Sequence, residues 1–216
     1  MPAAPLVTYA IVALNLWMYA HPSGTAFALI PYDVTHDVVL PPPSPPIPAL
    51  TLVTSMFVHG GIAHLGFNML FLIVVGPAVE AICGHARFAL FYLFCGIAGG
   101  ALQLAIAPNS HVPTIGASGA IAGVLGGYLV YPFLPVNTIV PLDLSPRMLR
   151  LVAVLLIGLW AAVQFQNGFG TLGDGAAESQ GGPAYFVHIA GFCAGVLVIG
   201  LFKIRSAARR ACWFHS

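Results

Sequence analysis

Two side chains in this sequence, Ser118 and His188, could together carry out nucleophilic catalysis. A serine hydroxyl is a poor nucleophile until a base removes its proton, and a histidine side chain titrates close to neutral pH. Both residues stand in long apolar stretches, where a polar side chain is costly and is therefore a functional candidate. We expect no carboxylate within a membrane span to orient the histidine, so the predicted arrangement is a dyad and not a triad.

A dyad of this kind also needs hydrogen-bond donors for the oxyanion of its tetrahedral intermediate, each worth about 2.7–4 kcal/mol. The available donors are His64, Asn68 four residues further on, and the backbone amide of Ser118. Taken alone, each polar residue is more often a hydrogen bond within or between helices. His59 is more often a residue that fixes a loop, and we list it only as supporting. The combination of these residues favours chemistry.

The composition places these residues in a membrane. The 216-residue chain is 59% hydrophobic and only 6% charged, with a mean hydropathy of +0.93, whereas soluble domains carry roughly 25% charged residues. The near-neutral charge gives no indication of nucleic-acid binding. A spanning helix needs about 20 mostly apolar residues. We predict an all-α, polytopic bundle of six spans in a domain covering residues 1–203, at roughly 5–19, 61–82, 87–107, 117–134, 147–163 and 184–203.

The segments between the spans carry turn signals. The proline run at residues 41–48 cannot be helical, because proline lacks an amide hydrogen and has a fixed φ, so we predict an extended loop on the membrane surface. A glycine-rich stretch at 168–183 is predicted to separate the last two spans, and 204–216 to form a basic tail. All seven basic residues lie in or beside the second and fourth loops and this tail, which predicts that both termini are cytoplasmic.

In this topology the second, fourth and sixth spans run in the same direction. Ser118, His188, His64 and Asn68 then all lie within roughly two helical turns of the outer face. Agreement in depth on three helices predicts one water-accessible pocket that opens outward. Small residues beside the candidate dyad allow close helix contact. These glycines are Gly119, Gly123 and Gly127 on one span and Gly191 and Gly195 on another, and Gly116 and Gly119 are supporting site candidates.

Three segments, HGGIAHLGFNM (residues 59–69), GASGA (116–120) and HIAGFCAG (188–195), resemble the signature segments of rhomboid proteases. The likeness extends from about residue 5 to residue 202. It implies a six-helix bundle that cleaves transmembrane protein substrates in or near the bilayer without metal or cofactor. Ser118 matches the nucleophile of that family, His188 its general base, and His64 and Asn68 its oxyanion-stabilising side chains.

The sequence departs from the family pattern at two places. Position 122, where the family often has an aromatic residue that stacks on the base, is Ala122, so we expect that support from elsewhere, with Tyr185 and Phe186 as candidates. The Trp-Arg pair often present in the first external loop of the family is absent, and the proline run occupies part of that loop.

Two alternatives compete with the protease hypothesis. An inactive rhomboid-like protein that binds membrane clients typically lacks the serine or the histidine, and this chain has both. A transporter could bind Zn²⁺ through His59, His64 and His188, but ion pathways usually carry intramembrane acids, and we expect none here. We expect a bacterial plasma membrane location, because the chain is compact and has no Arg- and Ser-rich transit segment. The sequence leaves substrate identity and oligomeric state open.

Overall fold

The structure is a bundle of helices. It is a computed structural model that describes residues 4–22, 24–131, 145–171 and 185–204. Within these residues the bundle has six apolar helices of 13 residues or more and no β-strand beyond a single isolated bridge, so the predicted all-α class is confirmed. The six helices are α1 (Leu6–Ala20), α4 (Ile62–Cys83), α5 (His85–Ile106), α6 (Ser118–Val130), α7 (Pro146–Thr171) and α9 (Tyr185–Phe202).

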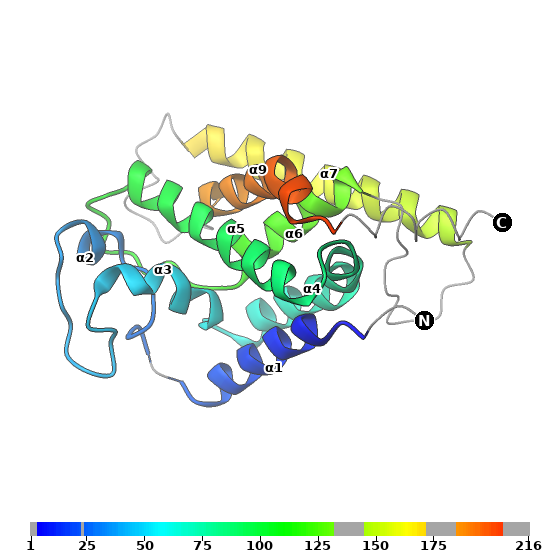
Figure 1. The fold of residues 1–216 in the computed structure, drawn as a ribbon. Coiled ribbons are helices and arrows are strands. Elements are labelled where there is room, and N and C mark those ends of the chain that lie inside the picture. The colour runs from blue at the N-terminus through cyan, green and yellow to red at the C-terminus, as the bar shows by residue number, and fades with distance from the viewer. Residues whose placement is uncertain (1–3, 23, 132–144, 172–184, 205–216) are drawn as a thin grey trace.

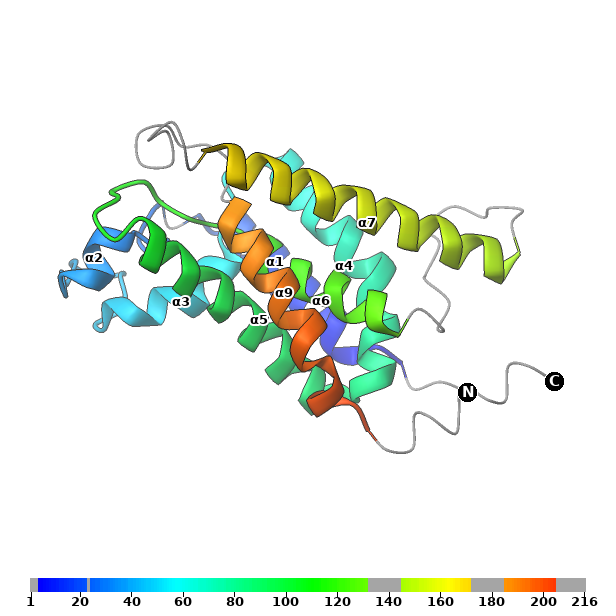
Figure 2. The same cartoon turned by 90° about the horizontal axis from the view of Figure 1, so that it is seen from above.

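The short helix α6 lies at the centre of the bundle (Figures 1 and 2). Every residue from Gly119 to Tyr128 is buried, and the helix packs most extensively against α9 and α5. Figure 2 shows α7 along the outside of the bundle, where it contacts mainly α9. The centre of the bundle therefore carries the residue at the start of α6, which is Ser118.

Four of the helices, α4, α5, α7 and α9, are long and apolar enough to cross a membrane. The helices α1 and α6 are shorter, with 15 and 13 residues. Thirteen residues rise only about 20 Å, against a hydrocarbon core of about 30 Å. At least one end of α6 must therefore lie at membrane depth, where neighbouring protein has to cover its unpaired backbone groups.

The observed helix bounds agree with four of the predicted spans within two residues and differ at the other two. The helix α6 ends at Val130, four residues before the predicted end. The helix α7 continues to Thr171, so the predicted end at residue 163 is wrong, as is the start of the predicted glycine-rich break at 168. Gly168 lets α7 approach α9, because a Cβ there would lie 2.7 Å from Cδ1 of Ile189. The rest of that break and residues 205–216 of the predicted basic tail lie outside the described residues.

The segment between α1 and α4 is only partly the extended loop that the proline run predicts. Residues 41–47 are not helical, but short helices flank them: α2 (Pro31–Thr35), η1 (Pro48–Leu50), α3 (Thr51–Thr54) and η2 (Ser55–Phe57). Pro48 begins η1, because a proline is tolerated at the first position of a helix, where its missing amide hydrogen is not needed.

Backbone hydrogen bonds fasten this segment to the chain that leads into α6. Leu29 and Thr114 exchange two, at 3.0 and 2.8 Å, and the amide of Gly116 donates to the carbonyl of Ser55 at 2.9 Å. The segment between α1 and α4 therefore helps to hold the approach to Ser118 in place.

At the opposite end of the bundle, a buried carboxylate corrects the expectation that no acid lies within a span. Glu80 is in α4 and only 2% exposed. It accepts hydrogen bonds from the amides of Val7 (2.9 Å) and Thr8 (2.8 Å) and from the hydroxyl of Thr8 (2.6 Å), and it contacts His85. These amides begin α1 and have no partner within that helix, so Glu80 caps α1. It belongs to the structure of this end and not to the candidate dyad.

Candidate active site

Ser118 and His188 are in direct hydrogen-bond contact. The Oγ of Ser118 lies 2.7 Å from the Nε2 of His188. Ser118 is the first residue of α6, and His188 lies in the first turn of α9. The distance falls within the 2.6–3.2 Å expected between a nucleophile and its base. Two residues 70 positions apart in the sequence therefore lie at a distance that allows proton transfer.

Glycines bring α6 and α9 close enough for this contact. A Cβ on Gly191 would lie 2.0 Å from the carbonyl oxygen of Gly119, and a Cβ on Gly195 would lie 2.0 Å from the carbonyl oxygen of Gly123. Real Cβ atoms essentially never approach so closely, so the two backbones pack directly against each other, as the small-residue faces predicted. Gly119 therefore supports the site by allowing α9 to pack closely against α6.

Gly116 places the two remaining polar residues beside the start of α6. Its φ is +113°, which favours glycine. A Cβ at this position would lie 2.7 Å from the Nε2 of His64 and 3.7 Å from the Nδ2 of Asn68. Both α4 side chains therefore face the backbone two residues before Ser118.

The amide group of Asn68 is a buried donor. Its Nδ2 has no hydrogen-bond partner within the described part of the chain, and the residue is only 6% exposed. Leaving such a donor unsatisfied costs about 1–3 kcal/mol. The first amides of α6 add to it, because the first amides of a helix have no carbonyl partner within it. Donors from α4 therefore lie against the backbone at Gly116, two residues before the first turn of α6.

His59 lies behind this arrangement. Its ring packs edge-on against that of His64, with 5.1 Å between centroids, and the amide of Ala117 donates to its Nε2 at 3.5 Å. Burial, followed by the charge of His64, lowers the pKa of His59 to about 4. A neutral His59 can accept the hydrogen bond from the amide of Ala117, which precedes Ser118. Its position therefore fits the supporting role expected from the sequence.

Sequence reasoning missed two residues that contact His188, both on α7. The Oε1 of Gln164 lies 2.8 Å from the Nδ1 of His188, and the ring of Trp160 lies 5.8 Å from the imidazole, centroid to centroid. The expected aromatic support therefore comes from Trp160 and not from Tyr185 or Phe186. A usable signal was present, because the four-residue spacing puts Trp160 and Gln164 on one helical face. The early predicted end of α7 concealed it.

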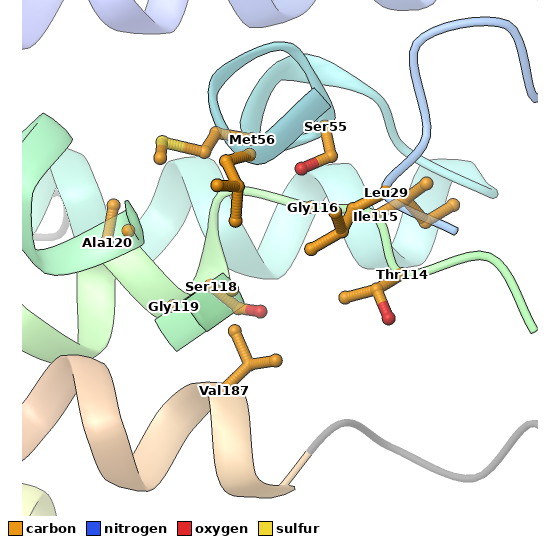
Figure 3. A pocket seen from close by; sticks show the side chains of 13 residues that line it. Leu29, Ser55, Met56, Thr114, Ile115, Gly116, Ser118, Gly119, Ala120 and Val187 are labelled. Carbon is orange, nitrogen blue, oxygen red and sulfur yellow. The ribbon is translucent and has the colours of Figure 1, made fainter. Parts of the chain in front are cut away.

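A small cavity adjoins Ser118 (Figure 3). In Figure 3, Ser118 and Gly119 lie opposite Val187 of α9, while Ser55 and Met56 of η2 lie across the cavity. Further walls come from α5 and from the segment before α6. A group held here would lie against the hydroxyl of Ser118.

This fold and site define a class, a polytopic helical membrane protein with a Ser–His pair near one end of its bundle. Comparison with known proteins agrees with that class and identifies a family within it. A model of the rhomboid domain matches residues 48–205, which is more than half of the chain. The chain therefore belongs to the rhomboid family.

Individual relatives come from bacteria, plants and animals. Rhomboid protease GluP of Bacillus subtilis (strain 168) is 49% identical over 78 residues, 36% of this chain. RHOMBOID-like protein 4 of Arabidopsis thaliana is 34% identical over 154 residues, 71% of this chain. Rhomboid-related protein 2 of Mus musculus is 28% identical over 151 residues, 69% of this chain. The chain spans only 15%, 34% and 47% of the lengths of these three relatives.

Proposed function

We propose that this protein is an intramembrane serine endopeptidase that hydrolyses peptide bonds of transmembrane protein substrates. The observation that carries the proposal is the 2.7 Å contact between the Oγ of Ser118 and the Nε2 of His188. Membership of the rhomboid family supports it, as does the similarity to the bacterial relative, which is named a rhomboid protease. An inactive relative would have no need to keep this pair in contact.

In the proposed reaction, His188 accepts the proton of the Ser118 hydroxyl as its oxygen attacks the carbonyl carbon of the scissile bond. The carbonyl oxygen becomes an oxyanion, for which His64, Asn68 and the amide of Ser118 are the proposed donors. Collapse of this intermediate breaks the C–N bond, and His188 gives its proton to the leaving amine. Water then hydrolyses the acyl-enzyme by the same two steps, with His188 again acting as base.

The substrate class follows from where the proposed dyad lies. Ser118 and His188 lie on helices of a membrane bundle, so the substrate chain must reach this pair from the bilayer. A helical peptide bond is hydrogen-bonded and shielded, so a substrate helix has to unwind locally before attack. In this proposal the cavity beside Ser118 lies next to the scissile bond of the bound substrate. We further propose that the dyad opens to the outside of a bacterial plasma membrane, with both termini in the cytoplasm.

The test uses purified protein reconstituted with a model substrate that has a single transmembrane span. We expect wild-type protein to release a defined fragment and Ser118→Ala and His188→Ala each to abolish its release. A serine-reactive phosphonate should label the wild type and not Ser118→Ala. Unchanged cleavage by Ser118→Ala would refute the proposal. A folded wild type that neither cleaves nor is labelled would favour the client-binding alternative.

A further inference from the structure

The proposed base, His188, has a second hydrogen-bond contact besides the one with Ser118. The Nε2 of His188 contacts Ser118, and its Nδ1 lies 2.8 Å from the Oε1 of Gln164. Gln164 comes from α7, on the outside of the bundle, while the pair it joins comes from α6 and α9. The three side chains form one continuous hydrogen-bonded row, Ser118–His188–Gln164, assembled from three helices.

Which imidazole nitrogen donates and which accepts in this row decides whether His188 can act as a base. A neutral imidazole carries its proton on one nitrogen and a lone pair on the other. Only the tautomer with Nδ1–H leaves the lone pair on Nε2, where it can accept the serine proton. The amide oxygen of Gln164 accepts from Nδ1–H and so selects this tautomer. The other tautomer would point a second donor at Ser118 and could not remove its proton.

A neutral amide suits this position in a membrane bundle. An ionised carboxylate here would carry a large desolvation cost, whereas the amide oxygen supplies a fixed acceptor without net charge. Trp160, one turn earlier on the same face of α7, packs against the imidazole, at 5.8 Å between centroids and 44° between planes. One face of α7 therefore provides both the hydrogen-bond partner and the packing surface of the base.

We propose that Gln164 is a positioning residue that acts through His188, so that the dyad is extended into a Ser–His–Gln row with Trp160 fixing the plane of the ring. This inference rests on the proposed function. Gln164 contacts neither the nucleophile nor the cavity, so it alters the turnover step and leaves substrate binding unaffected.

The kinetic test compares three variants with the wild type. Gln164→Leu keeps the approximate size and removes the acceptor, and we expect kcat to fall about 10- to 100-fold with KM unchanged, within the range for general-base catalysis. Gln166→Leu, two residues further on and exposed, is the matched control and should keep the wild-type kcat. Gln164→Glu restores an acceptor and should recover most of the activity. Wild-type kcat in Gln164→Leu would overturn the inference.

Gln164→Glu adds a signature that a purely structural role would not produce. Pairing with a protonated His188 offsets the desolvation cost of a carboxylate at this position. The carboxylate in turn stabilises the protonated imidazole, so the acidic limb of the kcat/KM profile should move to higher pH. Ser118 and Trp160 are neutral, and the titratable neighbour that acts on His188 is His64, which all three variants retain. Identical pH profiles for wild type and Gln164→Glu would contradict the inference.

A second readout does not depend on activity. In protein labelled with ¹⁵N-histidine, with the signal assigned through His188→Gln, the neutral form of His188 should be protonated at Nδ1 in the wild type and a mixture of tautomers in Gln164→Leu. Protonation at Nε2 in the wild type would overturn the inference whether or not the protein cleaves. An Nδ1–H tautomer in a protein that does not cleave would instead refute the proposed function and leave the positioning role standing.

Discussion

At the scale of single residues, the site is distinguished by polar atoms that face each other. Ser118 and His188 are hydrogen-bonded to each other through Oγ and Nε2, and the Nδ1 of His188 is hydrogen-bonded to Gln164. Asn68 differs, because its buried Nδ2 donates to no described residue. Natural proteins keep few such groups, and one beside a proposed nucleophile is explained if it donates to an oxyanion that exists only during the reaction.

We therefore predict that Asn68→Ala lowers kcat by roughly 10²-fold and changes KM little, because the lost hydrogen bond forms mainly with the developing charge. Initial rates on the reconstituted single-span substrate measure both constants. Phe67→Ala, on the neighbouring and 66% exposed residue of α4, is the control and should behave as wild type. A full kcat in Asn68→Ala would remove this residue from the proposed oxyanion site.

At the scale of helices, the site depends on how closely α6 and α9 pack. Gly119 and Gly123 face Gly191 and Gly195, and their backbones touch where any side chain would collide. Such contact lets hydrogen-bonding side chains on facing helices meet, and it contributes packing energy in a lipid environment that offers no hydrophobic driving force. Gly119 also packs against Val187, in the first turn of α9 that carries His188, because a Cβ on Gly119 would lie 2.6 Å from Cγ1 of Val187.

We predict that Gly195→Ala separates the two helices and lowers the free energy of unfolding by about 1–3 kcal/mol, the usual cost of overpacking. Thermal unfolding in detergent, together with phosphonate labelling of Ser118, checks the prediction, and both should decrease. Gly158→Ala on α7 is the matched control, because no atom lies within 4 Å of a Cβ there. It should be neutral or more stable by up to about 1 kcal/mol. Equal melting temperatures for the two variants would contradict this account.

At the scale of the whole molecule, the two ends of the bundle differ in chemistry. The Ser–His pair and the segments that cover it lie at one end. At the other end, Arg87 donates to the carbonyl of Lys203 at 3.1 Å, and Glu80 caps α1. The basic residues within the described part of the chain lie at or beside this second end, at the termini of α5, α7 and α9, which matches the charge distribution that predicts a cytoplasmic side.

We predict that a membrane-impermeant maleimide labels Thr25→Cys in intact bacterial spheroplasts and labels Ala86→Cys only after the membrane is permeabilised. Both positions are exposed. Thr25 follows the end of α1 and Ala86 lies in the first turn of α5, and these two helix termini lie at opposite ends of the bundle (Figure 1). The experiment uses a background with the four native cysteines replaced by alanine. The reverse labelling pattern would show that the dyad end faces the cytoplasm.

The sequence by itself predicted the helical class, four helices within two residues, and the four polar residues of the candidate site. The class and these helices were predictable because six long apolar runs leave few alternatives to a helix bundle. The four polar residues could be singled out because a polar residue in an apolar run is conspicuous, and their roles stay a prediction. The sequence did not reveal that α7 continues to Thr171, because glycine signals a break only on average and Gly168 instead serves helix contact. It also left Glu80 unrecognised as a buried cap.

Only the tertiary structure decided which side chains meet. The contacts of His188 with Ser118 and with Gln164 span 70 and 24 residues of sequence, and no local pattern sets the rotation of one helix about its axis relative to another. That rotation follows from packing, here from glycine backbones in contact and from Trp160 against the imidazole. Residue types therefore determined what chemistry is available, whereas helix packing determined which nitrogen of His188 faces the serine.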